Sequence, residues 1–333
     1  MPHAQDSPVR IGVIGFGIMG ERLVRASLAK PADALVVAGV WDPSPSAMTR
    51  LAHELPGVAR LASVEDLIAA SDVVHVASPP SSHLAYLDQV TERGRAVLLE
   101  KPLAVDVAAA RAAVIKHEVA RSRVGVNFVL ASSLAVDQIA RWQVDGAIGE
   151  PQAVDIEVDF AQWPRPWQQD AAGWLGKRAE GGFTREVVSH FLFLTLRRFG
   201  ALTVVSCSAT FPVGDASETE ISAELRAGTI PVSLKGRVGG TTKADHNIWR
   251  LTSARGSVRL RDWSFAEQLD ANDHWREATD AIPNDKARPL VLSRQLDKVM
   301  VMVRAAPDGK PSGLATLREA LIVQETVEEI LGN

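Results

Sequence analysis

The sequence predicts an α/β fold in which an N-terminal doubly wound parallel sheet is followed by a second domain. Its 333 residues are too many for one ordinary hydrophobic core, so two domains are expected, residues 1–126 and 127–333. In residues 9–126, short continuous apolar runs alternate with longer helical segments. This alternation is typical of a parallel sheet that helices cover on both faces.

The elements of the first domain follow from hydrophobic periodicity. Apolar runs predict strands at 9–14, 35–40, 73–77, 96–99 and 124–126. Helical spacing predicts helices at 18–28, 46–55, 64–70, 82–91 and 105–121. Ser63 and Asp66 have the spacing of an N-cap pair at the start of the third of these helices.

The second domain has a different pattern. Residues 132–145 have helical spacing, and a C-terminal helix is predicted from about residue 314 to 331. Between these helices, polar and apolar residues alternate one by one, as in half-buried strands. The alternating segments are 154–160, 203–211, 218–227, 232–238, 249–252 and 257–260.

Composition limits the partners and the compartment. With 46% hydrophobic and 23% charged residues, the chain has the composition of a soluble globular protein. A formal net charge of −4 argues against nucleic acid as a partner. No apolar stretch reaches the ~20 residues that span a bilayer, and no signal peptide is evident, so a cytoplasmic protein without membrane contact is expected. The single cysteine, Cys207, excludes an internal disulfide, and no metal site is expected from the histidine spacing.

A glycine-rich segment lies where the first strand meets the first helix. It reads Gly15-Phe16-Gly17-Ile18-Met19-Gly20. In a dinucleotide-binding turn, the first glycine permits the tight turn, the second lets the pyrophosphate approach, and the third allows close packing of helix and strand. The N-terminus of the following helix offers N–H groups and partial positive charge to the phosphates.

Asp42 follows the second predicted strand, about 20 residues after the glycines, where a carboxylate accepts hydrogen bonds from the adenosine ribose. Its charge would repel a 2′-phosphate. No arginine follows in residues 43–46, and Arg50, the nearest, is expected on a helix. NAD is therefore favoured over NADP.

A lysine stands at the end of an apolar strand, in the segment Glu100-Lys101-Pro102. Ligands bind at the carboxyl ends of parallel strands, so Lys101 is expected at the cofactor crevice. There its ammonium group could stabilise alkoxide character on a reacting oxygen. Without the glycine-rich segment, a solvated surface lysine would be the simpler interpretation.

A second group of candidates follows Gly181-Gly182. Glu186 and His190 stand four residues apart, which places them on one helix face and suits general acid–base work. Arg185 could pair with a substrate carboxylate or with an acidic side chain of the protein. Further upstream, Trp163 and Trp167 either line a substrate pocket or cover the sheet.

In order and spacing, these motifs resemble those of the glucose–fructose oxidoreductase/inositol dehydrogenase/MocA family of nicotinamide-dependent oxidoreductases. The resemblance implies a Rossmann domain followed by an α+β domain with a large, mostly antiparallel open sheet. In the family this sheet often forms the subunit interface, which implies a homodimer or homotetramer. Lys101 and His190 correspond to the family's catalytic pair. Further matching segments, which imply cofactor contacts beside the glycines, contain Ser78, Pro79, Pro80, His83 and Glu100.

These observations predict an NAD-dependent dehydrogenase that interconverts a secondary alcohol and a ketone on a sugar, inositol or related cyclic polyol. The chain departs from the family pattern at Glu186 and Val188, which stand in place of Asp and Gly, and at Val129, where arginine is frequent. One alternative is a dihydrodiol dehydrogenase or imine reductase whose carboxylated cyclic substrate pairs with Arg185. A second alternative is a non-catalytic redox sensor that binds NAD(H).

Overall fold

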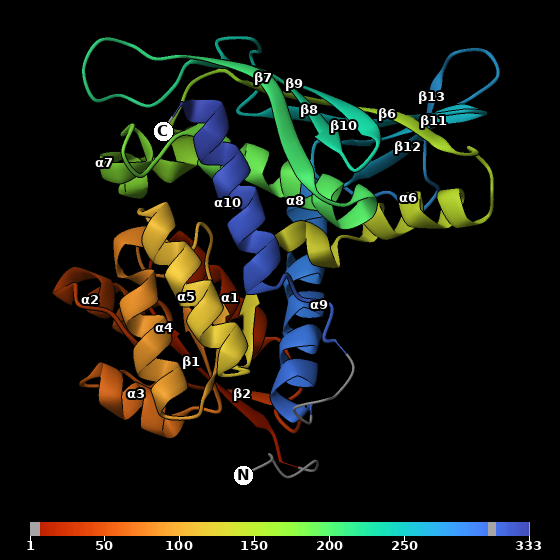
Figure 1. Ribbon diagram of the computed structural model, residues 1–333. Helices are drawn as coiled ribbons and strands as arrows, with labels where there is room; N and C mark the ends of the chain where they lie inside the picture. Colours follow the sequence, from red (N-terminus) through yellow and green to blue (C-terminus); the bar gives the residue numbers. More distant parts are fainter. Residues whose placement is uncertain (1–6, 306–310, 333) are drawn as a thin grey trace. The chain divides into compact units, whose positions relative to one another are not determined.

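The computed structural model describes residues 7–305 and 311–332, which divide into two compact units (Figure 1). The first unit contains the chain up to Phe128 together with Leu292–Leu321. The second contains Val129–Val291 together with the chain from Ile322 onward. The expected division after residue 126 differs from this one, because a C-terminal segment joins the first unit.

Two long helices continue from one unit into the other. They are α9 (Asn284–Arg304) and α10 (Leu317–Leu331). The sequence predicts α10 but not α9, since Pro289 lies inside α9 and proline ordinarily interrupts a helix.

The first unit contains a five-stranded parallel sheet in the order β2-β1-β3-β4-β5. Every residue of β3 and β4 is buried, as expected for strands covered on both faces. Its strands are β1 (Val9–Ile14), β2 (Leu35–Trp41), β3 (Val73–Val76), β4 (Ala96–Leu99) and β5 (Val124–Val126). Its helices include α1 (Ile18–Leu28), α2 (Pro45–Glu54), α3 (Val64–Ala70), the short η1 (Pro80–Ser82), α4 (His83–Glu92) and α5 (Val107–Val119). The predicted doubly wound parallel sheet is confirmed.

Local capping explains where some of these helices begin. Ser63 accepts a hydrogen bond from the Asp66 amide at 3.1 Å and donates one to its carboxylate at 2.7 Å, which confirms the predicted cap of α3. Within the first unit, Leu296 and Val299 of α9 pack in one hydrophobic cluster with Val9 and Ile11 of β1. The C-terminal part of the chain therefore completes the core of the N-terminal fold.

The second unit contains an eight-stranded sheet in the order β13-β12-β11-β10-β6-β9-β8-β7. Only the β6–β9 pair is parallel, so the predicted mostly antiparallel sheet is confirmed. Its strands are β6 (Pro151–Phe160), β7 (Leu202–Thr210), β8 (Glu220–Ala227), β9 (Ile230–Val238), β10 (His246–Ser253), β11 (Gly256–Arg261), β12 (Phe265–Leu269) and β13 (Trp275–Glu277).

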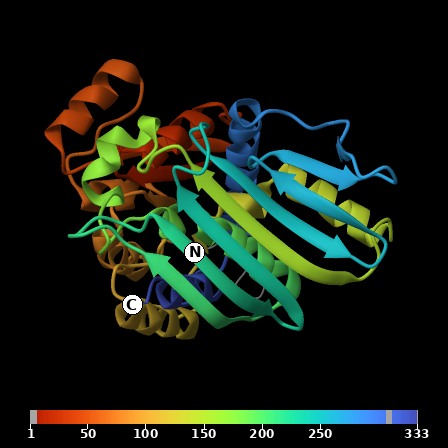
Figure 2. The same ribbon diagram turned by 90° about the horizontal axis from the view of Figure 1, so that it is seen from above.

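Helices α6 (Leu134–Val144) and α8 (Ser189–Phe199) lie against one face of this sheet (Figure 1). Figure 2 shows the face of the sheet that points away from these helices, with its strands next to one another. Residues of β8 alternate strictly between exposed and buried, because only one face packs against helices. Shorter helical segments complete the unit: η2 (Val129–Ser132), η3 (Pro166–Ala171), α7 (Ala172–Leu175) and η4 (Thr184–Val188).

Candidate functional site

The three glycines between β1 and α1 occupy positions with different steric requirements. Gly15 has a φ of +94°, and a Cβ there would lie 2.7 Å from the Ala77 carbonyl oxygen. A Cβ at Gly20 would overlap the Gly15 carbonyl oxygen, so this glycine allows α1 to pack closely. A Cβ at Gly17 would meet open space, with no heavy atom within 4 Å. The loop therefore has the tight turn, the open approach and the close packing that a dinucleotide pyrophosphate requires.

Asp42 is tied to this loop. Its carboxylate accepts hydrogen bonds from the amides of Phe16 and Ser44, both at 2.7 Å. Arg50 of α2 also reaches the loop, where its guanidinium lies 4.6 Å from the centre of the Phe16 ring and donates to the Phe16 carbonyl oxygen. Arg50 forms an ion pair with Glu21 of α1, so its charge is already partly balanced. Arg50 is predicted on a helix from the sequence, but its contact with the loop is not.

Buried polar groups hold Glu100 at the end of β4. The Glu100 carboxylate accepts a hydrogen bond from Asn127 at 2.6 Å and lies 3.0 Å from His75 Nε2. Gln295 of α9 in turn donates to the Asn127 side chain at 3.1 Å. Burial alone would raise the pKa of Glu100, but the hydrogen bonds from His75 and Asn127, with the charge of Lys101, hold that pKa below its ordinary value. The residue before Lys101 is therefore an ordered carboxylate.

His83 connects two loops at the carboxyl ends of β3 and β4. Its ring nitrogens lie 2.8 Å from the Pro102 carbonyl oxygen and 2.7 Å from that of Ser78. Burial lowers the pKa of His83 despite these two contacts. Ser78 also accepts a hydrogen bond from Ser82 at 2.7 Å. The expected cofactor-contact residues Ser78, Pro79 and Pro80 thus belong to one connected loop, with the Lys101–Pro102 segment held beside it.

His190 lies in the second unit, in the first turn of α8, and is 6% exposed. The five residues before α8, Thr184–Val188, form a π-helical turn rather than the expected regular helix. A π turn closes i to i+5 hydrogen bonds instead of the i to i+4 bonds of an α-helix, so the backbone that carries Glu186 is wider than that of the predicted helix. Such turns are frequent at functional sites.

The π turn is anchored at its start by Glu218. The amide and hydroxyl of Thr184 both donate to the Glu218 carboxylate, at 2.7 and 2.6 Å. Burial raises the pKa of Glu218 although these hydrogen bonds oppose the shift. Neither Thr184 nor Glu218 stands out in the sequence, because their pairing joins two distant segments.

Arg185 forms a buried salt bridge. Its Nε and Nη2 atoms donate to the two carboxylate oxygens of Glu328 in α10, both at 2.6 Å. Its Nη1 atom donates to the carbonyl oxygens of Arg178 and Gly181. The side chain is 7% exposed. Of the two interpretations left open by the sequence, the structure contains the internal salt bridge, which leaves little of the guanidinium to bind a substrate carboxylate.

Arg165 lies among the tryptophans. Its guanidinium is 5.5 Å from the centre of the Trp163 ring and 4.5 Å from that of Trp167. Trp163 donates to the Leu175 carbonyl oxygen and packs against Phe160 at the end of β6, so its contacts are mainly with the interior of the protein. Trp167 is 40% exposed. Of the two candidates, Trp167 is the tryptophan with more surface accessible to a ligand.

A tight turn between β11 and β12 brings Trp263 to His190. Asp262 and Trp263 both have positive φ, 46° and 71°, and the Ser264 amide donates to the Arg261 carbonyl oxygen across the turn. This is the type I′ geometry that usually selects Asn-Gly. The Trp263 ring lies 5.5 Å from the His190 ring, with the two planes at 80°.

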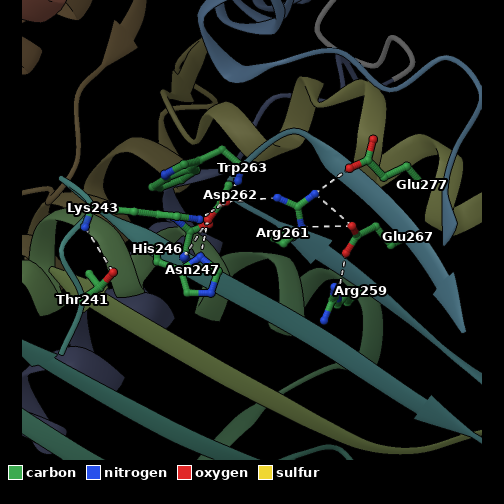
Figure 3. A network of polar contacts seen from close by, with 10 residues as sticks. All are labelled: Thr241, Lys243, His246, Asn247, Arg259, Arg261, Asp262, Trp263, Glu267 and Glu277. Atoms are coloured by element: carbon green, nitrogen blue, oxygen red, sulfur yellow. Dashed lines mark hydrogen bonds and ion pairs between the residues drawn. The ribbon is translucent and has the colours of Figure 1, made fainter. Parts of the chain in front are cut away.

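Polar contacts hold this turn in place (Figure 3). Asp262 accepts from His246 at 2.7 Å, while the Trp263 amide donates to the Asn247 side chain at 3.1 Å. Burial would raise the pKa of Asp262, but the hydrogen bond and charge of His246 keep that pKa below its ordinary value. The same network continues along β11 through the ion pair of Arg261 with Glu267. Such a bulky residue at positive φ is uncommon and is tolerated where the surroundings hold it.

Two absences apply to the described ranges 7–305 and 311–332. They contain no group of three or more His, Cys, Asp or Glu side chains arranged to hold a metal ion. Within the same ranges, no helix has both the length and the apolar character needed to cross a membrane.

Comparison with known proteins agrees with the fold and the glycine-rich loop. Residues 9–128 match the oxidoreductase family with the NAD-binding Rossmann fold, the Gfo/Idh/MocA family. The chain carries the NAD-binding domain of this family, and the resemblance noted from the motifs is confirmed.

Among curated relatives, inositol 2-dehydrogenase 1 from Saccharopolyspora erythraea is 37% identical over 151 residues. That alignment spans 44% of this chain and 44% of the relative, which is less than half the length of either protein. Among solved structures, an oxidoreductase from Thermotoga maritima has a TM-score of 0.80 at 17% identity, over 97% of this chain and 96% of that chain. An oxidoreductase from Agrobacterium radiobacter in complex with NAD+, L-tartaric acid and magnesium has a TM-score of 0.79 at 16% identity, over 98% and 97% of the two chains. These structural likenesses extend to both units and concern the fold.

Proposed function

We propose that this protein is an NAD-dependent dehydrogenase that interconverts a secondary alcohol and a ketone on a sugar, an inositol or a related cyclic polyol. The observation that carries the proposal is the loop of Gly15, Gly17 and Gly20, which leaves open space only at the position where a pyrophosphate would approach. The inositol 2-dehydrogenases among the relatives support a polyol as the substrate class.

The cofactor would be held by residues of the first unit. The amides at the start of α1 face the pyrophosphate in such loops, and Asp42 would accept the ribose hydroxyls. The NAD-binding family model and the neighbour crystallised with NAD+ support this assignment. When bound, the nicotinamide would accept the hydride that leaves the substrate carbon.

The reaction assigns separate roles to two residues. In the oxidative direction, His190 takes the proton of the substrate hydroxyl, and Lys101 stabilises the negative charge that develops on that oxygen. In the reductive direction, His190 returns the proton. Glu186 would contact a neighbouring substrate hydroxyl or orient His190. These roles rest on the match to the family motifs.

The carboxylated cyclic substrate of the first alternative depends on Arg185. Because the Arg185 guanidinium is engaged with Glu328 and two carbonyl oxygens, that support is lost and the polyol is favoured.

We also propose that two or four copies associate through the face of the eight-stranded sheet that α6 and α8 leave uncovered. Native mass spectrometry tests this: Lys235→Glu, an exposed change on β9, is expected to favour the monomer. A wild-type protein that is monomeric at micromolar concentration would contradict it.

The test of the activity is a substrate panel. Purified protein is incubated with NAD or NADP and a set of inositols, sugars and sugar acids, and the formation of reduced cofactor is followed by absorbance. Turnover of at least one polyol that His190→Ala abolishes is expected. Tight NADH binding without turnover of any polyol would instead favour the redox sensor.

A further inference from the structure

A second arginine lies against the exposed tryptophan of the second unit. Arg288, in the first turns of α9, has its guanidinium carbon 5.8 Å from the centre of the Trp167 ring. Arg165 lies 4.5 Å from the centre of the same ring. Two cations thus contact one indole. The ring quadrupole attracts each guanidinium, but the arrangement also brings two positive charges close together.

The charge of Arg165 is already balanced by the protein. Its Nη1 atom lies 2.6 Å from the Asp245 carboxylate, and its Nη2 atom lies 3.9 Å from that of Glu186. Its Nε atom donates to Gln168 at 2.8 Å. Arg165 is 4% exposed, and a buried guanidinium needs such partners. Each of the three guanidinium nitrogens of Arg165 thus has a polar partner in the protein.

Arg288 is not balanced in the same way. Over the described ranges, the structure contains no hydrogen bond and no ion pair made by its guanidinium, although the side chain is half-buried. Burial lowers the pKa of Arg288, and the charge of Arg165 lowers it further, whereas Asp245 and Asp285 attract it from beyond ion-pair distance. The N–H donors of the Arg288 guanidinium are therefore available to a ligand.

We propose that Arg288, with Trp167 beside it, binds an anionic group of the substrate, a carboxylate or a phosphate. A guanidinium presents parallel N–H donors that match both groups. Asp245 and Glu186 face Arg165, so an added negative charge is accommodated at Arg288 rather than between the two arginines. Glu186 links this subsite to the π turn before His190. The inference deepens the proposed function, on which it rests, because it makes the preferred substrate an acidic polyol.

The first test compares matched neutral and anionic substrates. Glucose is paired with glucuronate, and myo-inositol with myo-inositol 1-phosphate, so the two pairs separate a carboxylate from a phosphate. For the anionic member of the accepted pair, Arg288→Gln is expected to raise KM roughly 10- to 100-fold, as when hydrogen bonds between charged groups are lost. KM for the neutral member is expected to stay within about twofold. Arg288→Lys keeps the positive charge but lacks the paired N–H donors of a guanidinium. Its KM for the anionic substrate should lie between those of wild type and Arg288→Gln.

Arg93→Gln, an exposed arginine at the end of α4, is the matched control and should change neither KM. An equal KM for Arg288→Gln and wild type with both anionic substrates would overturn the inference, and so would an equal rise for neutral and anionic members. In either case, turnover of the neutral polyols would leave the proposed function intact.

Calorimetry supplies a readout that does not need turnover. Inorganic phosphate and gluconate are titrated into the NADH-loaded protein, and Arg288→Gln is expected to abolish the binding of at least one of them. If no polyol is oxidised by wild type but this loss is observed, the proposed reaction fails and the anion subsite stands. Unchanged binding of both anions in Arg288→Gln would refute the subsite.

Discussion

The indole of Trp263 meets the imidazole of His190 edge to face, with ring centres 5.5 Å apart and planes at 80°. Trp263 reaches this position from a turn in which its own φ is +71°. A side chain at positive φ costs on the order of 1 kcal/mol or more, so the turn is held by contacts elsewhere, including those of Asp262 and Asn247. The strained turn therefore places the ring that limits how the His190 side chain moves.

Trp263→Ala is expected to lower kcat by roughly 10- to 100-fold, because the His190 ring gains freedom to leave its reactive orientation. Trp263→Phe keeps a ring at this position and should restore most of the rate. Steady-state kinetics on an accepted substrate measure both. Asp273→Gly, which relieves a φ of 59° in another turn, is the control and should leave kcat unchanged. Wild-type kcat in Trp263→Ala would show that the contact has no role.

Lys101→Ala is expected to leave NADH binding near the wild-type level while lowering kcat by about 10²- to 10⁴-fold, since charge stabilisation on the reacting oxygen is lost. Fluorescence titration measures the binding and steady-state kinetics measure the rate. Lys116→Ala, an exposed lysine of α5, is a suitable control. If Lys101→Ala retains full kcat, the assigned role is refuted.

Asp42→Ser is expected to shift cofactor preference toward NADP. The carboxylate that would bind the ribose and repel a 2′-phosphate is removed, while Arg50 remains at the Phe16 carbonyl oxygen nearby. The ratio of kcat/KM for NAD to that for NADP should fall by roughly 10-fold or more, from the loss of hydrogen bonds of about 1–3 kcal/mol. A wild-type protein that strongly prefers NADP would contradict the assignment at the outset.

Arg185→Gln is expected to destabilise the protein by about 3–5 kcal/mol, because it leaves the Glu328 carboxylate buried without its partner. The double variant Arg185→Met/Glu328→Leu should recover most of that loss, since it removes both charges. Chemical denaturation measures the free energies of unfolding. If Arg185→Gln is as stable as wild type, the salt bridge with Glu328 contributes nothing to the free energy of unfolding.

Stability is expected to fall in acid partly through Glu100. Its folded-state pKa lies below the ordinary value of 4.5. Its contribution is therefore fully present above pH 4.5 and is lost as pH falls through the lower, folded-state value. Thermal melting across this acidic range should show a shallower loss of Tm for Glu100→Gln than for wild type. Parallel curves for the two proteins would exclude Glu100 as a contributor.

Much of the first unit was predictable because its signals are local. The apolar runs of β1 to β5 and the spacing of Gly15, Gly17 and Gly20 each lie within a few residues. The Ser63–Asp66 cap is another short-range pattern that the structure contains. Such patterns are set by backbone geometry and periodicity, which act over one turn or one strand.

Other features depend on residues far apart in the chain. Helix α9 completes the core of the first unit, and Gln295 on it reaches Asn127, 168 residues away. Arg185 and Glu328 are 143 residues apart, so nothing near Arg185 could choose between a substrate and an internal partner. The π turn before His190 is likewise bound at its start by Glu218, which is 34 residues from Thr184 in the chain.

By itself the sequence determined that the chain has a nucleotide-binding parallel sheet followed by half-buried strands, because hydrophobic period and glycine geometry are short-range properties. The mostly antiparallel pairing of those later strands was implied by the family resemblance. Only the tertiary structure decided which charges are engaged: Arg185 is bound by Glu328, Arg165 by Asp245, and Arg288 by no ion pair within the described part of the chain. The physical reason is that electrostatic pairing depends on distances between side chains, and folding sets those distances independently of their separation in sequence.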